Sequence, residues 1–338
     1  MLDRAKIPVL AKRTGFGALL WVAVVLGLYG AHAQGKTAAA ADPSPCALLN
    51  ADEVEEVLGG PLAGPPFRAG GAIPAENGEA CRYETADYRS IDLRVEWNDG
   101  GTTFGAMGML GDVVDEGGLK GVLKLSDGTI LTGAWDEARV FMCCEFHALR
   151  GEQLVTVDIS GSRATIAQAA ALADAALRRI EAPLDVDDAA SIGAAEARMA
   201  ERPPLRPVCE LVTRAEAEAI VGATLSAEPA GNDGSCTYVW VSPADNIDYE
   251  FELRTTWRRG FSEMRNTLAA IGQSMAMFEE QGLAFDAEQT SDGPLFDEFA
   301  TNLIGTMAVR KDVFLSIESG PFMTELSTAF IKAAASKL

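Results

Sequence analysis

Residues 45–59 read PCALLNADEVEEVLG, and residues 208–222 align with them without a gap as VCELVTRAEAEAIVG. Both stretches predict a short helix with the same kind of beginning and end. Asn50 and Thr213 are preferred N-cap residues, and in each stretch a Glu three places later completes a capping box. Apolar residues recur at the i, i+3, i+4 spacing of a buried helical face. Gly59 and Gly222 then occupy the position after a helix where a left-handed residue is favoured.

The similarity between the two halves of the chain continues in the same order toward the C-terminus. Segments 93–97 and 253–257 alternate apolar or Thr residues with charged or polar ones, which predicts strands with one buried face. Alanine-rich segments 165–180 and 324–338 predict a closing helix in each half, and another helix is predicted over 261–281. The matched segments are 81–83 (CRY) and 236–238 (CTY), 93–97 (LRVEW) and 253–257 (LRTTW), 126–128 and 291–293 (both SDG), 136–137 and 297–298 (both DE), and 154–159 (LVTVDI) and 313–317 (VFLSI).

We therefore predict an α+β protein made of two diverged copies of one domain. Each copy follows the order helix, strand, strand, helix, strand, strand, helix, which an antiparallel sheet with packed helices would accommodate. The predicted boundaries are 44–182 for the first copy and 207–338 for the second, joined by a Pro-, Ala- and Asp-rich linker over 183–206. A short helix is predicted within the linker, near residues 189–200, and residues 34–43 are predicted to be disordered.

The first 33 residues have the pattern of a secretory signal peptide. Basic residues at positions 4, 6, 12 and 13 precede an apolar run over 16–28, and Ala31-His32-Ala33 matches a small-x-small cleavage site. This apolar run is shorter than the roughly 20 residues that a membrane-spanning helix needs. We expect a periplasmic or secreted protein with no membrane span after signal cleavage.

The composition is acidic, with 28 Lys and Arg against 49 Asp and Glu and a formal net charge of −21. Nucleic acids and anionic lipid headgroups require cationic partners, so neither is an expected ligand. The hydrophobic fraction of 48% is sufficient for well-packed cores, which argues against a disordered chain.

The repeat predicts how four of the six cysteines pair. Each half has one cysteine just before its first helix and one on its first predicted strand, which gives Cys46–Cys81 and Cys209–Cys236 as disulfides. Cysteines of exported proteins are usually oxidised. On the chain-entropy model, loops of this size contribute about 3.5–4 kcal/mol each.

Cys143 and Cys144 are adjacent and have no counterparts in the second half. Three interpretations remain open for them. They could be buried or half-buried thiols on a strand, or they could form a disulfide with each other. They could also bind a metal together with His147, since thiolate and imidazole ligands suit Cu(I) or Zn.

Few residues are available for catalysis. His147 is the only histidine after residue 33, so a Ser-His-Asp triad or a two-histidine metal site has at most one candidate histidine. No Walker loop, HExxH or Gly-x-Ser-x-Gly motif occurs, and no cofactor is predicted. The repeated acidic pairs Asp136-Glu137 and Asp297-Glu298 are the best candidates for a carboxylate-based hydrolase, although solvated turns are the simpler interpretation of them.

Both halves resemble the DUF3558-type envelope domains found in secreted and lipid-anchored bacterial proteins. The resemblance implies an envelope-facing binding or sensing role and no established reaction. Two departures from the pattern are the absence of a lipid-attachment cysteine and an extra Phe299 before Ala300. The resemblance is carried by residues 46–59, 81–83, 136–138 and 149–151 in the first half and by 209–222, 236–238, 297–298 and 309–311 in the second.

The leading prediction of function is therefore a non-catalytic, extracytoplasmic binding or sensing protein of the bacterial envelope. Its partner would be an envelope protein or a small ligand. A metal-binding or redox protein using Cys143, Cys144 and His147 is the first alternative, and a carboxylate-based hydrolase is the second.

Overall fold

The computed structural model describes most of the chain from residue 42 onward. The predicted signal peptide and almost all of the segment predicted as disordered lie outside the described residues. Among the helices that are described, none is long and apolar enough to cross a membrane. The described residues are 42–68, 79–109, 113–116, 120–141, 143–186, 188–279, 288–290, 295–301, 305–319 and 323–338.

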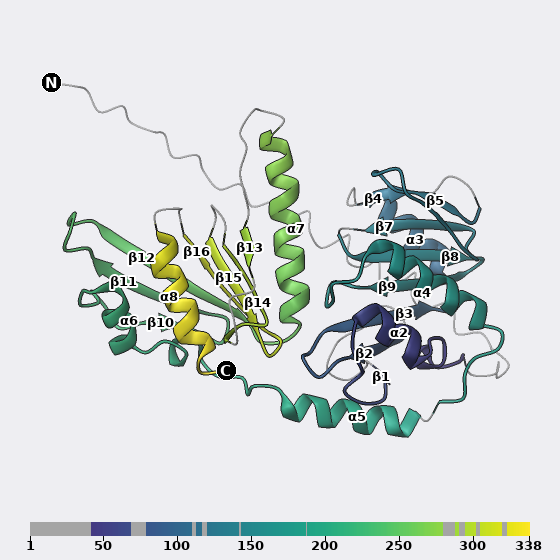
Figure 1. Ribbon diagram of the computed structural model, residues 1–338, viewed down its shortest axis with the longest axis horizontal. Coiled ribbons are helices and arrows are strands. Elements are labelled where there is room, and N and C mark those ends of the chain that lie inside the picture. The colour runs from purple at the N-terminus through teal and green to yellow at the C-terminus, as the bar shows by residue number, and fades with distance from the viewer. Residues whose placement is uncertain are drawn as a thin grey trace, which may run out of the picture. The chain divides into compact units, whose positions relative to one another are not determined.

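The first sheet is antiparallel and has seven strands in the order β1-β2-β3-β9-β8-β7-β4 (Figure 1). A separate hairpin is formed by β5 and β6. In chain order the elements of this region are the 3-10 helix η1 (Pro45–Ala47), helix α2 (Ala51–Leu58), strands β1 (Phe67–Arg68), β2 (Glu79–Glu84) and β3 (Ser90–Glu96), helix α3 (Gly100–Met109), strands β4 (Val113–Glu116), β5 (Val122–Lys124), β6 (Ile130–Thr132), β7 (Glu137–Phe141), β8 (Glu145–Arg150) and β9 (Gln153–Asp158), and helix α4 (Ile166–Arg179).

The second sheet is also antiparallel and has seven strands, in the order β10-β11-β12-β16-β15-β14-β13. Helices α7 and α8 lie alongside it in Figure 1. The elements that lead to and form this region are helix α5 (Asp188–Glu201), the 3-10 helix η2 (Val208–Glu210), helix α6 (Arg214–Val221), strands β10 (Ala230–Gly231), β11 (Ser235–Val241) and β12 (Asp248–Thr256), helix α7 (Gly260–Glu279), strands β13 (Glu288–Thr290), β14 (Glu298–Thr301), β15 (Gly305–Arg310) and β16 (Val313–Glu318), and helix α8 (Thr324–Ala335).

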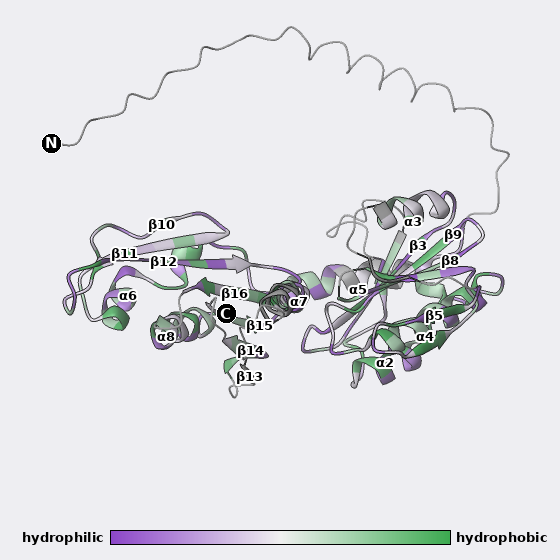
Figure 2. Cartoon of the chain, turned by 90° about the horizontal axis from the view of Figure 1, so that it is seen from above, coloured by the Kyte–Doolittle hydropathy of each residue, from purple (hydrophilic) through white to green (hydrophobic). Residues whose placement is uncertain are grey.

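Each sheet has its main core on one face, where alternate strand residues are apolar and pack against helices. Helices α3 and α7 pack on the opposite faces through smaller apolar clusters. In the first sheet Leu93, Val157 and Phe146 pack against α4 in the main core. Figure 2 shows α2 and α4 on the same side of this sheet and α3 on the other. In the second sheet Leu253 and Leu315 pack against α8.

The predicted helix ends are confirmed at α2 and α6. Asn50 accepts a hydrogen bond from the helix backbone and forms a capping box with Glu53, and Thr213 does the same with Glu216. The residue after each helix is a left-handed glycine, with φ of 73° at Gly59 and 69° at Gly222.

The disulfides Cys46–Cys81 and Cys209–Cys236 join the 3-10 turns η1 and η2 to strands β2 and β11. These are the two pairs that the repeat predicts. Each bond holds the segment before a capped helix against the core face of a sheet, and the loops they close span 35 and 27 residues.

The α+β class with antiparallel sheets is confirmed, but the predicted plan of four strands in each half is too small. The strands that the plan lacks include β1, β4, β10 and β13, which are two to four residues long. Such strands are too short to show the alternation from which a strand is recognised. The helix predicted in the linker near 189–200 is present as α5.

Candidate functional site

The central strands of the two sheets pair in the same register. Arg94 on β3 stands opposite Thr156 on β9, and Arg254 on β12 stands opposite Ser316 on β16. These four residues lie on the sheet faces turned away from α4 and α8, because their strand neighbours Leu93 and Leu253 belong to the cores. We call these two faces the outer faces. One carries ion-paired side chains and the other carries a cleft.

The outer face of the first sheet carries a layer of buried and half-buried charges at its centre. Arg82 on β2 donates two hydrogen bonds to Asp92 on β3, at 2.7 and 2.6 Å. The Arg82 side chain is 1% exposed and that of Asp92 is 6% exposed. Burial alone would raise the pKa of Asp92, but the bidentate Arg82 guanidinium outweighs it and holds this pKa below its usual value.

The charged layer continues across β9 and β8. The Asp158 carboxylate lies 3.1 Å from Arg94 and 3.0 Å from Arg259, which precedes α7. Glu145 lies 3.7 Å from Arg94 and 3.2 Å from the Nε2 atom of His147. Burial, and then the neighbouring Glu145, raise the pKa of Asp158, although both arginines oppose this rise. We call Arg82, Asp92, Arg94, Glu145, His147 and Asp158 the charged layer.

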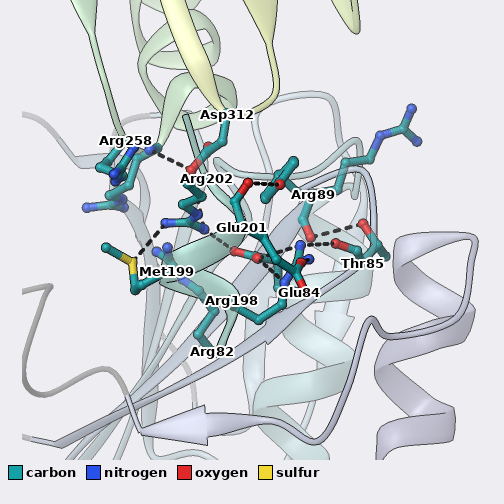
Figure 3. A network of polar contacts seen from close by, with 12 residues as sticks. Arg82, Glu84, Thr85, Arg89, Arg198, Met199, Glu201, Arg202, Arg258 and Asp312 are labelled. Carbon is teal, nitrogen blue, oxygen red and sulfur yellow. Dashed lines mark hydrogen bonds and ion pairs between the residues drawn. The ribbon is translucent and has the colours of Figure 1, made fainter. Parts of the chain in front are cut away.

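A second group of buried charges surrounds the C-terminal end of α5 (Figure 3). Arg202 forms an ion pair with Glu84 on β2 and lies 3.3 Å from Asp312 in the turn between β15 and β16. Glu84 is also 2.9 Å from Arg198. At the centre of this group, each charged side chain is at most 4% exposed; these are Arg202, Glu84 and Asp312.

Burial raises the pKa of both carboxyl groups in this cluster. For both groups, the largest effect that opposes this rise in pKa is the positive charge of Arg202. Asp312 has two further stabilising contacts, because its carboxylate accepts hydrogen bonds from the backbone N–H groups of Arg259 (3.0 Å) and Gly260 (2.9 Å) at the start of α7. The cluster therefore connects β2, the linker and the N-terminus of α7.

The outer face of the second sheet is hollowed into a cleft of about 550 Å³. Strands β12, β15 and β16 form its floor, with Met307 and Phe314 as apolar residues and Ser316 as a polar one. Helix α7 forms a wall through Thr267 and Ile271. The exposed side chain of Arg254 lines the cleft as well and pairs with Glu318 at 2.6 Å.

The residues at matched register positions of the two outer faces differ in size and charge. The positions that hold Glu145 and His147 in the first sheet hold Gly305 and Met307 in the second. Gly305 has no side chain and Met307 has no charge. Because neither residue brings an ion-pairing side chain to this position, space remains between β15 and α7.

Cys143 and Cys144 form a disulfide with each other at the tip of the β7–β8 hairpin. The interpretation as free thiols is therefore wrong. All six cysteines lie among the described residues, and none of them is free. Neither sulfur is available as a thiolate ligand, and the described part of the chain contains no group of three His, Cys, Asp or Glu residues suited to a metal ion.

The His147 side chain is engaged within the sheet. Its Nδ1 atom is 2.9 Å from the Thr156 hydroxyl, and its Nε2 atom faces Glu145. The ring is buried. Its contacts are those of a structural residue of the charged layer, held by one hydroxyl and one carboxylate.

The repeated acidic residues are not brought together. Asp136 accepts a hydrogen bond from the backbone N–H of Gly151 at 2.8 Å, in the turn between β8 and β9. Asp297 accepts a hydrogen bond from the backbone N–H of Lys311 at 2.5 Å, in the matching turn between β15 and β16. Each of these carboxylates therefore closes the turn of the hairpin next to it. Glu298 is buried and pairs with Arg163 at 3.0 Å.

The sequence alone does not identify the charged layer or the cleft. One signal for the layer was present: Arg82, Asp92, Arg94 and Asp158 are charges of both signs at alternate positions of central strands. Such positions usually face solvent, so alternation alone does not distinguish an exposed face from a covered one. The cleft depends on the distance between α7 and the sheet, for which the sequence gives no local pattern.

Comparison of the chain with protein-family models, curated proteins and solved structures finds no match. The resemblance to DUF3558-type envelope domains remains a prediction from the residues.

Proposed function

We propose that this protein is a non-catalytic binding protein of the bacterial envelope, built from two diverged copies of one domain, in which the cleft of the second copy takes a small ligand. The observation that carries the proposal is the cleft of about 550 Å³ between α7 and strands β12, β15 and β16. Small-molecule sites commonly have volumes of about 300–1,000 Å³ and combine an apolar floor with a few polar groups.

Matched details of the two sheets support a duplication. The Tyr83 hydroxyl donates to the backbone carbonyl of Leu49, and the Tyr238 hydroxyl donates to that of Val212. In both cases a buried strand tyrosine fixes the chain just before a capped helix. Unrelated domains with similar topology would have no reason to share this bond.

The beginnings of α3 and α7 support the same conclusion. The Gly100 N–H donates to the carbonyl of Glu152 at 3.0 Å, and the Gly260 N–H donates to that of Asp312 at 2.9 Å. At both positions an added Cβ would lie 2.7 Å from backbone atoms of the neighbouring hairpin turn. The requirement for glycine is therefore the same in both halves.

The two copies would then have different roles. In the first copy, ion pairs fill the outer face, which contacts the N-terminal end of α7 through Asp158 and Arg259. In the second copy the same helix packs on the outer face through Met264 and Ile271 and leaves the cleft over part of that face. We assign ligand binding to the second copy and the positioning of α7 to the first.

The lining of the cleft indicates what kind of ligand would fit. Met307, Phe314 and Ile271 offer apolar contact, while Ser316 and Thr267 offer hydroxyl groups. An uncharged or weakly charged molecule with both apolar and hydrogen-bonding parts matches this lining. A strongly anionic ligand does not, because Glu263 and Glu318 also line the cleft beside Arg254.

Export to the envelope is supported by the signal-like pattern of residues 1–33 and by three disulfides. Disulfides persist in the bacterial periplasm and outside the cell, where they are not reduced by the cytosolic thiol pool.

The cleft can be tested with Nile red, an uncharged dye that fluoresces in apolar clefts. Ser316→Trp places a bulky ring in the cleft, and Val241→Trp places the same ring on an exposed position of β11 outside it. We expect Ser316→Trp to weaken dye binding at least about tenfold, equivalent to about 1.4 kcal/mol, and Val241→Trp to leave it nearly unchanged. Equal dye binding by Ser316→Trp and the unmodified protein, with both folded by circular dichroism, would rule out the cleft as the binding site. Small molecules that displace the dye would then be ligand candidates.

A further inference from the structure

The three disulfides differ in the length of chain that they close and in their burial. Cys46–Cys81 and Cys209–Cys236 close loops of 35 and 27 residues, and Cys46, Cys81 and Cys236 are buried. Cys143–Cys144 joins adjacent residues, and Cys143 is half-buried. A disulfide stabilises a fold mainly by restricting the unfolded chain, and this effect grows with the length of the loop. Stabilisation of the fold therefore does not account for the third disulfide.

Cys143 is the more exposed of the two cysteines, and its sulfur is therefore the expected point of attack by an external thiol. Cys144 is buried, and its backbone carbonyl accepts a hydrogen bond from the N–H of Ile159 at 2.9 Å. The next residue, Glu145, is held by Arg94 and His147. The β8 side of the hairpin tip is thus fixed in the charged layer, while Cys143 lies on its more accessible side.

The contact that Cys143 makes depends on its oxidation state. Its Sγ atom lies 3.7 Å from the side-chain Oδ1 atom of Asn266 on α7. A disulfide sulfur carries no hydrogen and can only accept a hydrogen bond. A Cys143 thiol would carry one and could donate it to Asn266. Reduction therefore changes the contact between the hairpin and α7.

The same helix forms a wall of the cleft. Asn266 is followed directly by Thr267, which lines the cleft, and Ile271 lines it one turn later. A change at Asn266 is transmitted to these residues through the backbone of a single helix. The hairpin tip and the cleft are therefore in contact with the same rigid element.

We propose that Cys143–Cys144 is a thiol–disulfide exchange site whose substrate is a dithiol and whose oxidation state alters helix α7. This coupling to the cleft rests on the proposed binding function. A thiolate of the dithiol attacks Cys143 Sγ and forms a mixed disulfide, and the Cys143–Cys144 bond breaks. Its electron pair goes to Cys144 Sγ, which takes up a proton. The second thiol of the dithiol then displaces Cys143, which leaves as a thiol, so two electrons and two protons are transferred and the dithiol becomes a disulfide.

Differential alkylation tests the exchange site on the full exported chain. The protein is equilibrated with dithiothreitol mixtures of increasing reducing strength, and the thiols that appear are alkylated and located by mass spectrometry. We expect Cys143 and Cys144 to be alkylated under milder conditions than the other four cysteines, while circular dichroism stays unchanged. Reduction of all three disulfides together, or of Cys143–Cys144 last, would overturn the proposal.

Hydrogen exchange of α7 tests the coupling without any ligand. Peptides covering residues 260–272 are compared between the oxidised protein and the protein reduced only at Cys143–Cys144. We expect their exchange rates to differ, and the difference to be absent when Cys143→Ser/Cys144→Ser is compared under the same two conditions. Identical exchange in both states of the unmodified protein would refute the coupling. Dye binding to the cleft is measured separately, so that a failure of the binding function can be distinguished from a failure of the redox site.

Discussion

The cluster at Arg202 gives the most direct test of how the described chain is held together. Replacing Arg202 with Met removes one buried cation and leaves Glu84 and Asp312 without it. Loss of one partner of a buried ion pair costs about 3–5 kcal/mol, because the remaining charge is neither hydrated nor paired. Two remaining contacts should keep the cost of Arg202→Met near the lower end of this range. Glu84 keeps its contact with Arg198, and Asp312 keeps two backbone N–H donors.

We therefore expect Arg202→Met to lower the free energy of unfolding by about 3 kcal/mol near neutral pH. The control is Arg178→Met, which removes an exposed i, i+4 pair with Asp174 on α4. Exposed pairs of this kind contribute about 0.3–0.5 kcal/mol. Urea unfolding followed by circular dichroism and by tryptophan fluorescence measures both variants.

The pH dependence of this loss has a defined sign. Burial raises the pKa of Glu84 and Asp312 in the folded protein above their ordinary values of 4.5 and 3.8. Each group therefore favours the folded state below its ordinary pKa, and this contribution is lost as the pH rises through the raised value. Without Arg202 both pKa values rise further. The deficit of Arg202→Met should thus be largest at about pH 8 and smaller at about pH 5. A deficit below about 1 kcal/mol at the higher pH, or one that grows on acidification, would refute the assignment of a buried ion-pair cluster.

Two further predictions concern helix ends. Thr213→Ala removes the N-cap of α6 and should cost about 1 kcal/mol. A hydrogen bond from Lys337, followed by those from Thr213, lowers the pKa of Glu216 to about 2, so its stabilising contribution is present above pH 4.5 and is lost as the pH falls toward that value. Carbon-detected NMR titration should show the Glu216 pKa rising in Thr213→Ala, and an unchanged pKa would contradict the capping geometry. At the start of α7, Gly260→Ala should destabilise by about 1–3 kcal/mol, because its Cβ would overlap backbone atoms of the β15–β16 turn. Gly272→Ala in the same helix meets open space and should stabilise by roughly 0.5–1 kcal/mol, so equal effects in urea unfolding would contradict this placement of α7.

The features that could be predicted from sequence are those with a local signal. The helix ends at Asn50 and Thr213 depend on side chains three residues apart and on one glycine, so a short stretch of sequence contains all the participants. The pairing of Cys46 with Cys81 is not local. It became predictable because the second half supplies an independent example of the same spacing.

The charged layer and the cluster at Arg202 could not be predicted, because their burial depends on segments distant in sequence. Asp158 is paired by Arg259, about a hundred residues later, and Glu84 is paired by Arg202 from the linker. Alternating polar residues on a strand predict a solvent-facing surface when no other element covers it. Here the covering elements come from the linker and from the start of α7. Their positions follow from tertiary packing, so no window of the sequence contains them.

Buried ion pairs are a costly way to fill the outer face of a sheet, since apolar residues of similar volume are often at least as stabilising. Apolar residues would, however, tolerate several positions of the covering segment. The Oδ2 atom of Asp158 accepts hydrogen bonds from both Arg94 and Arg259, and Arg259 immediately precedes α7. The same helix has its first backbone N–H groups bound by Asp312, which Arg202 links to Glu84. The position of α7 beside the cleft therefore depends on contacts with the first sheet as well as on its apolar packing against the second. The first sheet, whose outer face is filled by ion pairs, thus helps to hold the helix that forms a wall of the cleft on the second sheet.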